Sequence, residues 1–278
     1  ATALDIVWYS ADQRTPSEAQ LPLDAYFRHS ETAVMRSAWE DRDAVFVGFK
    51  GGRNTANHGH LDLGSFVVDA DGYRWAEDPG SDNYGLPFYF TWGRFLYYRL
   101  MTQGHNTLLV NGRGQYFDGD VKITSFLSTP EKTIVVADLS SAYHLAPGQL
   151  RRGIALLHRR DVLVRDEFRL DAPADIVWQL HTAATVEVAG NKATLRQGGT
   201  AFSAIIREPE SAAFAVSTHV FTPPHRPGDP LTELTIHLQA PAGESHLAVQ
   251  LSPGGAGNVA ELSDRSLTQW SDTGANSK

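Results

Sequence analysis

The feature that most constrains the fold is a long series of short alternating segments separated by turn residues. From about residue 23 onward, runs rich in Val, Ile, Thr and aromatic residues are interrupted by Gly, Pro, Asn or Asp at intervals of about 8–12 residues. Residues 69–72 (Asp-Ala-Asp-Gly) and 111–112 (Asn-Gly) are turn signals that place glycine where a positive φ is needed. No segment after residue 30 has a convincing helical period. The sequence therefore predicts an all-β fold, either a sandwich or a barrel.

Three regions follow one another along the chain. Residues 1–22 contain a helix-like apolar stretch and then a polar part with two prolines, and we interpret them as the remnant of a preceding helical domain plus a linker. Residues 23–270 form one β domain, and residues 271–278 are a polar tail that is expected to fray. The predicted strands are residues 32–39, 44–50, 61–68, 73–76, 107–110, 133–138, 152–158, 162–168, 176–181, 194–196, 201–207 and 232–238.

The composition excludes several classes of function. The net charge is −8, and nucleic-acid binding needs a basic face, so no nucleic-acid partner is expected. A polyanionic substrate would for the same reason need a local cationic pocket. The chain has no cysteine, which excludes disulfides, thiolate metal sites and thiol nucleophiles. No apolar run approaches the roughly 18 residues of a membrane helix, so no membrane span is expected.

Histidines and an aspartate stand at spacings that suggest a metal site. If the segment around His58 and His60 is extended, the two side chains point to the same face, because residues two apart do so in a strand. Asp78 lies on the return strand of the hairpin, and His105 opens the next strand. Two neutral imidazoles and one carboxylate with an open position are a normal zinc environment.

The match in position is imperfect. With a three-residue loop at 70–72, Asp78 faces Gly64, which lies four residues from His60, or roughly 13 Å at the rise of a strand. A bulge or bend near Gly64 or residues 79–80 would have to close this offset.

A second metal assignment uses the same stretch. His60 and Asp62 with the distant His105 match the His-x-Asp…His facial triad of non-haem iron oxygenases, and Arg113 lies downstream where a carboxylate clamp for a co-substrate would be needed. The chain has 11 histidines, so a close pair can also arise by chance among ordinary surface or core histidines.

Residues 82–99 form an unusually aromatic segment without a clean period. It is interpreted as a long, partly buried loop that caps one edge of the fold, or as an arginine-bearing wall on which sugar rings stack, and both can hold together. Its eight aromatic residues are Tyr84, Phe88, Tyr89, Phe90, Trp92, Phe95, Tyr97 and Tyr98.

Four segments carry a family resemblance. They are residues 57–66 (Asn-His-Gly-His-Leu-Asp-Leu-Gly-Ser-Phe), 71–80 (Asp-Gly-Tyr-Arg-Trp-Ala-Glu-Asp-Pro-Gly), 97–99 (Tyr-Tyr-Arg) and 104–112 (Gly-His-Asn-Thr-Leu-Leu-Val-Asn-Gly). In order and local context, they resemble the heparinase II/III-like polysaccharide lyases over about residues 23–115. The remainder, to about residue 270, fits the β-sandwich of that family only in general style.

The resemblance implies a fold, a cofactor and partners. It implies that this chain is a large antiparallel β-sandwich of the supersandwich type, which in the family follows an N-terminal (α/α) toroid. It implies zinc bound by His60, Asp78 and His105, with His58 facing the substrate cleft beside the metal. The implied partners are an acidic polysaccharide or oligosaccharide and the N-terminal α/α domain, and the implied location is periplasmic or secreted.

The resemblance also implies a reaction, the β-elimination of a uronate-containing polysaccharide such as a heparin-like or alginate-like polymer. A base removes the C5 proton, the uronate carboxylate is neutralised, and an acid protonates the leaving oxygen. In the family, key Tyr and His residues come from the helical domain, so this chain alone is expected to be weak or inactive.

Roles within this chain follow from the same resemblance. His58 is the expected carboxylate neutraliser or proton-transfer partner, and Tyr89 is the expected phenol near the proton transfer. Zinc is expected to brace the structure, with Asp62 and Asn106 orienting the imidazoles. Packing or surface ion pairs are the alternative roles for the Tyr and Arg candidates. The expected substrate-binding residues are Arg94, Arg99, Tyr84 and Tyr98.

Two other functions stay open from the sequence. One is a carbohydrate-binding or structural zinc module without catalysis. The other is the iron oxygenase that would use His60, Asp62 and His105.

Overall fold

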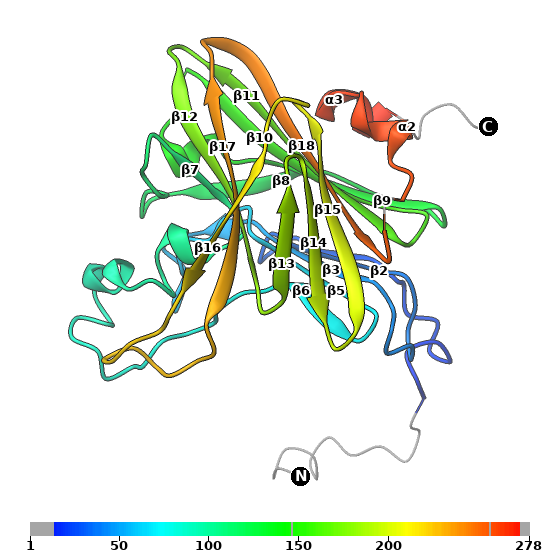
Figure 1. Cartoon of the computed structure of the whole chain (residues 1–278), viewed down its shortest axis with the longest axis horizontal. Helices are drawn as coiled ribbons and strands as arrows, with labels where there is room; N and C mark the ends of the chain where they lie inside the picture. The colour runs from blue at the N-terminus through cyan, green and yellow to red at the C-terminus, as the bar shows by residue number, and fades with distance from the viewer. Residues whose placement is uncertain (1–13, 146, 256, 273–278) are drawn as a thin grey trace.

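The alternating segments pair into three antiparallel sheets (Figure 1). The computed structural model describes residues 14–145, 147–255 and 257–272. Every strand pair within these ranges is antiparallel, and the two α-helices are short, α2 (Ala260–Ser263) and α3 (Leu267–Asp272). The prediction of an all-β fold is confirmed. Among the described helices, none is long and apolar enough to cross a bilayer.

The first sheet contains most of the N-terminal strands. Burial alternates along β2 and β3, where Ala33, Met35, Val47 and Phe49 face the core, as expected for strands with one buried face. In spatial order the sheet comprises β1 (Ala25–Phe27), β2 (Thr32–Arg36), β3 (Phe46–Lys50), β5 (Phe66–Ala70) and β6 (Tyr73–Ala76).

The second sheet has nine strands and is covered on part of both faces. Its central strands β10 and β11 are buried almost throughout, because α3 packs on the outer face with Trp270 fully buried. In spatial order the strands are β13 (Thr185–Ala189), β14 (Lys192–Gln197), β15 (Thr200–Glu208), β18 (Gly243–Pro253), β11 (Asp161–Leu170), β10 (Gln149–Leu157), β9 (Lys132–Asp138), β8 (Asp120–Ser128) and β4 (Gly52–Arg53).

The third sheet has four strands and carries the strand that follows the predicted metal ligand His105. In spatial order it comprises β16 (Phe214–His219), β17 (Leu231–Ala240), β12 (Ala174–Thr182) and β7 (Leu108–Val110). Three 3₁₀ turns interrupt the connections: η1 (Trp92–Leu96), η2 (Thr102–Gly104) and η3 (Ser140–Tyr143).

One large core joins the three sheets. Trp75 of β6 stacks on Phe202 of β15 with ring centroids 5.0 Å apart, which joins the first sheet to the second. Phe66 of β5 meets Trp178 of β12 at 6.2 Å, which joins the first sheet to the third. All four rings are essentially inaccessible to solvent, so the sandwich is held by large aromatic contacts between layers.

Several expectations differ from the structure in detail. The strand predicted at 61–68 begins only at Phe66, because residues 61–65 form a loop in which Gly64 has a φ of 78°. The strands predicted from the sequence did not include β1, β4, β8, β13, β16 or β18. The helix-like stretch within residues 1–13 and the tail from residue 273 lie outside the described residues.

Candidate metal site and aromatic loop

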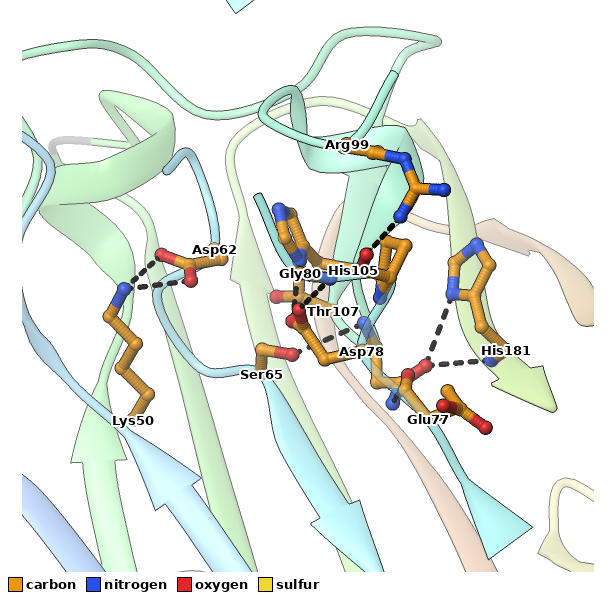
Figure 2. A network of polar contacts seen from close by, with 12 residues as sticks. Lys50, Asp62, Ser65, Glu77, Asp78, Gly80, Arg99, His105, Thr107 and His181 are labelled. Atoms are coloured by element: carbon orange, nitrogen blue, oxygen red, sulfur yellow. Dashed lines mark hydrogen bonds and ion pairs between the residues drawn. The ribbon is translucent and has the colours of Figure 1, made fainter. Parts of the chain in front are cut away.

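Three segments that are distant in the sequence converge beside the first sheet (Figure 2). They are the loop at 57–65 before β5, residues 77–80 after β6, and His105 between η2 and β7. The Leu61 N–H donates to the Leu100 carbonyl at 2.9 Å, which ties the first segment to the approach of the third. The site is thus built on loops whose ends are fixed by strands, a common arrangement for functional residues.

The hairpin between β5 and β6 sets the position of Asp78. Its turn is only two residues long (71–72), with both residues at positive φ, and Ala70 pairs directly with Tyr73. The expectation of a three-residue loop is therefore wrong. A β-bulge does shift the register, but its extra residue is Trp75 in β6, opposite the step from Val68 to Asp69 in β5.

His58 and His60 do not share one strand face, so the geometric argument from an extended segment is also wrong. His58 has a φ of 57°, in the left-handed region, and the surrounding residues form turns. His60 consequently turns toward His105, with ring centroids 5.3 Å apart, while the exposed His58 ring stacks on Tyr84 at 5.9 Å. The two histidines still lie at one site, but they face different neighbours.

Three potential ligands form the most compact group. The nearest ligand atoms of His60, Asp62 and His105 all lie within 4.8 Å of one another. Lys50 already binds Asp62, and its Nζ lies 2.6 and 2.7 Å from the two carboxylate oxygens. The carboxylate of Asp62 is therefore close to the histidines and is already neutralised by a cation.

Asp78 is paired with His105 directly. Its Oδ2 lies 2.8 Å from Nδ1 of His105, and its Oδ1 accepts a 2.8 Å hydrogen bond from the Gly80 N–H. Burial would raise the pKa of Asp78, but the charge and hydrogen bond of His105 and the Gly80 N–H outweigh it and hold that pKa well below its usual value. Burial would likewise lower the pKa of His105, yet Asp78 raises it. The pair is thus strongly coupled and favours an anionic Asp78.

The residues present fit a divalent metal ion. Nε2 of His105 is buried and has no hydrogen-bond partner, which is unusual for a ring nitrogen in a protein interior. Burial, followed by the neighbouring His105, lowers the pKa of His60 to about 4, so His60 is neutral at pH 7. Two nitrogen donors and two nearby carboxylates, with no thiolate, match the donors that zinc accepts.

Asn106 connects the strands around this group, and its neighbour His105 is fixed as a result. Its side-chain N–H groups donate to the carbonyls of Phe66 and Glu77, both at 2.8 Å. Its Oδ1 accepts the backbone N–H of His181 at 2.7 Å. Asn106 was expected to orient the ligand imidazoles, but the described contacts of its side chain are with backbone groups and, at 3.1 Å, with Nδ1 of His181.

Sequence reasoning missed a buried ion pair beneath the site. Arg152 forms two hydrogen bonds to Asp166 (2.7 and 2.9 Å) and is fully buried. Its Nη1 also donates to the carbonyls of Gly64 (2.8 Å) and Asn106 (3.0 Å). Arg152 and Asp166 are directly paired across β10 and β11, so a charge pair on two adjacent predicted strands was the available signal.

The aromatic loop places the rings of Tyr84 and Phe90 against His58, with Tyr89 behind them. Tyr84 lies 4.9 Å from Tyr89 and 5.5 Å from Phe90, measured between ring centroids. Tyr84 is 52% exposed and Phe90 66%, whereas Tyr89 is buried. Burial raises the pKa of Tyr89, so its phenol stays protonated at pH 7. Tyr84 and His58 therefore present the open surface, and Tyr89 supports them from below.

Tyr98 lies apart from this group and is committed to packing contacts. Its hydroxyl hydrogen-bonds to Glu233 and lies 2.8 Å from Nε2 of His181. Its ring stacks on His219 at 3.4 Å. Burial and then Glu233 raise the pKa of Tyr98 strongly. These contacts favour the packing alternative over the expected contact with substrate.

The two candidate arginines differ in availability. Arg99 is 3% exposed, donates to the carbonyls of Pro79 and Arg226, and lies over the Phe221 ring at 3.8 Å. It thus braces the loop after Asp78, and its placement does not support substrate binding. Arg94 is partly exposed and donates to the Gly59 carbonyl at 2.6 Å, beside His58.

The described residues line several surface pockets, of which one borders the candidate ligands. A pocket of about 220 Å³ borders Asp62 and Asp78. A larger one, of about 540 Å³, lies on the outer face of β10, β11 and β18 and contains none of the candidate residues. Its charged side chains are mostly paired with each other, as in Arg151 with Glu167. We place the candidate site at the histidines because their chemistry, rather than hollow size, identifies it.

Comparisons with known proteins identify the family of the chain and its fold. The family model described as "Heparinase II/III-like, C-terminal" matches residues 19–250. A comparison with curated proteins gave no match.

Three solved structures similar to this chain are of a heparinase III gene product, a heparan sulfate lyase and a further heparinase III. A heparinase III gene product has a TM-score of 0.70 and 15% identity. The match covers 83% of this chain and 36% of the heparinase III chain. The heparan sulfate lyase HepC from Pedobacter heparinus has a TM-score of 0.71 and 12% identity, covering 86% and 37%. A further heparinase III structure has a TM-score of 0.69 and 14% identity, covering 83% and 36%. At this identity the likeness shows the fold, and the chain spans little more than a third of these proteins.

Proposed function

This chain belongs to the heparinase II/III-like family of C-terminal domains, and on that basis we propose that it is the zinc-binding β-sandwich part of a polysaccharide lyase. The proposed reaction is β-elimination on a uronate-containing polysaccharide, either heparin-like or alginate-like. The observation that carries the proposal is an exposed His58, flanked by the Tyr84 and Phe90 rings, two residues before the half-buried His60 that faces the buried His105.

His58 is the proposed substrate-contacting residue. In β-elimination the C5 proton leaves only if the negative charge that develops on the uronate is stabilised. An exposed imidazole can donate a hydrogen bond to that carboxylate or transfer a proton. Tyr84 lies against the same ring and is open to solvent, so it is placed to stack on a sugar face.

Tyr89 is proposed to act through Tyr84 and Phe90, because it is buried and touches both rings. Arg94 holds the carbonyl of Gly59, and this contact fixes the loop that carries His58. Both are therefore positioning residues in this proposal.

His60, Asp78 and His105 are proposed to hold zinc. We favour Asp78 over Asp62 as the carboxylate ligand because Lys50 already binds both oxygens of Asp62, whereas Asp78 is anionic and adjoins His105. A bound zinc ion would supply a fixed positive charge that braces this loop. The residues around it, notably Asn106 and Arg152, hold the backbone in place with or without that charge.

The proposal includes a partner and a location. Because the chain spans 36–37% of the length of related lyase structures, we propose that an α/α domain supplies the remaining catalytic groups and that the 278-residue chain alone is weak or inactive. By resemblance to its family, the protein is proposed to act in the periplasm or outside the cell.

The compact group of His60, Asp62 and His105 is the one observation that favours a different ligand set, the facial triad of an iron oxygenase. Family membership favours polysaccharide chemistry instead, including a carbohydrate-binding module that keeps the metal without catalysis.

Product formation tests the proposal. Unsaturated uronates absorb near-ultraviolet light, so the full-length protein should generate such absorbance on at least one of heparin, heparan sulfate or alginate. Absence of product on every uronate polymer, from protein that still binds one of them, would favour the binding module.

A further inference from the structure

A pocket of about 330 Å³ opens at the tight turn that follows β7, and the proposed reaction uses none of the side chains that line it. Arg113 and Tyr116 contribute its exposed polar and aromatic groups, and the buried Tyr143 forms part of its wall. Its chemistry differs from that of the larger hollow on the second sheet, where the charged groups are mostly paired with each other.

The backbone presents Arg113 rigidly. Asn111 and Gly112 form a two-residue turn with φ values of 53° and 69°, and Val110 and Arg113 exchange two backbone hydrogen bonds of 3.0 Å. The Asn111 side chain accepts the Asp175 N–H at 2.9 Å, which anchors the turn to β12. Because the backbone of the turn is already fixed, ligand binding would have to order only the side chain of Arg113.

The guanidinium of Arg113 is uncommitted. Arg113 is exposed, and within the described part of the chain its side chain has no hydrogen bond or ion pair. The two arginines expected to bind substrate are engaged elsewhere, Arg94 with a backbone carbonyl and Arg99 in a buried position. An acidic chain needs a local cation to hold an anionic group, and a guanidinium can form paired hydrogen bonds with a carboxylate or sulfate.

An aromatic surface accompanies this cation. Tyr116 stacks on His144 with centroids 3.7 Å apart and an interplanar angle of 8°, and His144 is held by Asp118 at 2.8 Å. The neighbouring Phe117 is 52% exposed and contacts Phe95 at 5.6 Å. Partly exposed rings beside a charged group are the combination that an acidic sugar unit requires.

The same contacts connect the pocket to the candidate site. Phe95 follows Arg94, whose guanidinium binds the carbonyl adjacent to His58. On the other side, the Gln115 N–H donates to Thr102 at 2.8 Å, and Thr102 opens the 3₁₀ turn that leads to His105. Gln115 and Phe117, which flank the pocket lining, therefore contact segments that lead to both halves of the histidine site.

We propose that this pocket is an accessory subsite for an acidic saccharide, in which Arg113 binds a sulfate or carboxylate group and Tyr116 packs against the sugar. The identity of the polymer rests on the proposed function. The subsite itself requires only binding, so it can be tested without catalysis.

The test is isothermal titration of the full-length protein with two probes, a sulfated heparin-derived oligosaccharide and an alginate-derived oligouronate that carries carboxylates alone. Arg113→Ala should weaken binding of at least one probe about tenfold, and Arg113→Lys should restore part of it. Arg196→Ala, at an exposed arginine of β14, is the matched control and should change affinity less than about twofold. The probe that responds distinguishes sulfate from carboxylate recognition.

Equal affinity in wild type and Arg113→Ala, or no binding of either probe by the wild type, would overturn the subsite. Product absorbance in the same samples separates this result from the fate of the proposed function. If binding depends on Arg113 but no product forms, the lyase reaction is contradicted and the subsite is supported. If product forms but binding does not depend on Arg113, the subsite is contradicted and the lyase reaction is supported.

Discussion

The imidazole of His105 contacts the carboxylate of Asp78 through Nδ1, at 2.8 Å, and leaves its Nε2 buried without a partner. A buried nitrogen without a hydrogen bond costs roughly 1–3 kcal/mol, so a group that satisfies it is expected in the functional protein. The proposed zinc ion, shared with His60, would fulfil this requirement.

Metal content should distinguish the two nearby carboxylates. The purified protein is expected to contain about one zinc per chain by elemental analysis, with strongly reduced affinity in His60→Ala and Asp78→Ala. Asp62→Ala should keep zinc, because the side chain of Asp62 is bound by Lys50. Zinc lost in Asp62→Ala but kept in Asp78→Ala would make Asp78 an orienting residue of His105 and move the ligand role to Asp62.

The buried pair of Arg152 and Asp166 should dominate the stability of the site. Replacing Arg152 by Ala leaves an unpaired buried carboxylate and frees the carbonyls of Gly64 and Asn106, so the free energy of unfolding should fall by about 3–5 kcal/mol. Urea unfolding measures this change. Arg53→Ala breaks an exposed pair with Asp120 and should cost no more than about 1 kcal/mol. Similar losses in the two variants would contradict the buried role of Arg152.

Stability should depend on pH through His181. Burial lowers its folded-state pKa to about 4 from an ordinary 6.5, so between these values the unfolded chain binds more protons than the folded one. Stability is then full above pH 6.5 and declines as the pH falls toward 4, by up to about 3 kcal/mol from this group. His181→Gln should reduce the decline in unfolding experiments between pH 7.5 and 4.5, and an unchanged slope would argue against a neutral buried His181.

Substitutions of Tyr84 and Tyr98 should have opposite effects on saccharide binding and on stability. Tyr98→Phe removes a hydroxyl bound by Glu233 and near His181, so it should lower the free energy of unfolding by about 1–3 kcal/mol while leaving saccharide affinity unchanged. Tyr84→Ala removes an exposed ring and should weaken saccharide binding with little effect on stability. Thermal melts and titrations on both variants check this, and reversed effects would reassign the two tyrosines.

The sequence was sufficient for features that depend on local chemistry. The turn signal at 69–72 correctly marks a hairpin, although the expected loop at 70–72 was one residue too long. The strand β6 spans the predicted residues because alternation and a turn signal both mark it. The ligand candidates around His60 and His105 came from spacing and family resemblance together, and the structure brings those two rings to 5.3 Å.

Features that depend on tertiary contacts could not be obtained in this way. The left-handed backbone at His58 removes the extended conformation on which a shared face with His60 depended. From the sequence alone, Arg99 resembles an ordinary surface cation. Its partner, the carbonyl of Arg226, lies 127 residues later in the chain. Tyr98 likewise meets Glu233 across 135 residues. Such partners lie beyond any local pattern, so the packing roles of these residues emerged only from the fold.

The most direct test of the account is the rate of unsaturated uronate formation by the full-length, zinc-loaded protein and its His58→Ala variant. We expect product from the wild type and a reduction of about 10²-fold or more in the variant, with zinc content and folding retained because His58 is exposed and outside the ligand set. A His58→Ala protein that forms product at the wild-type rate would contradict the central role of His58.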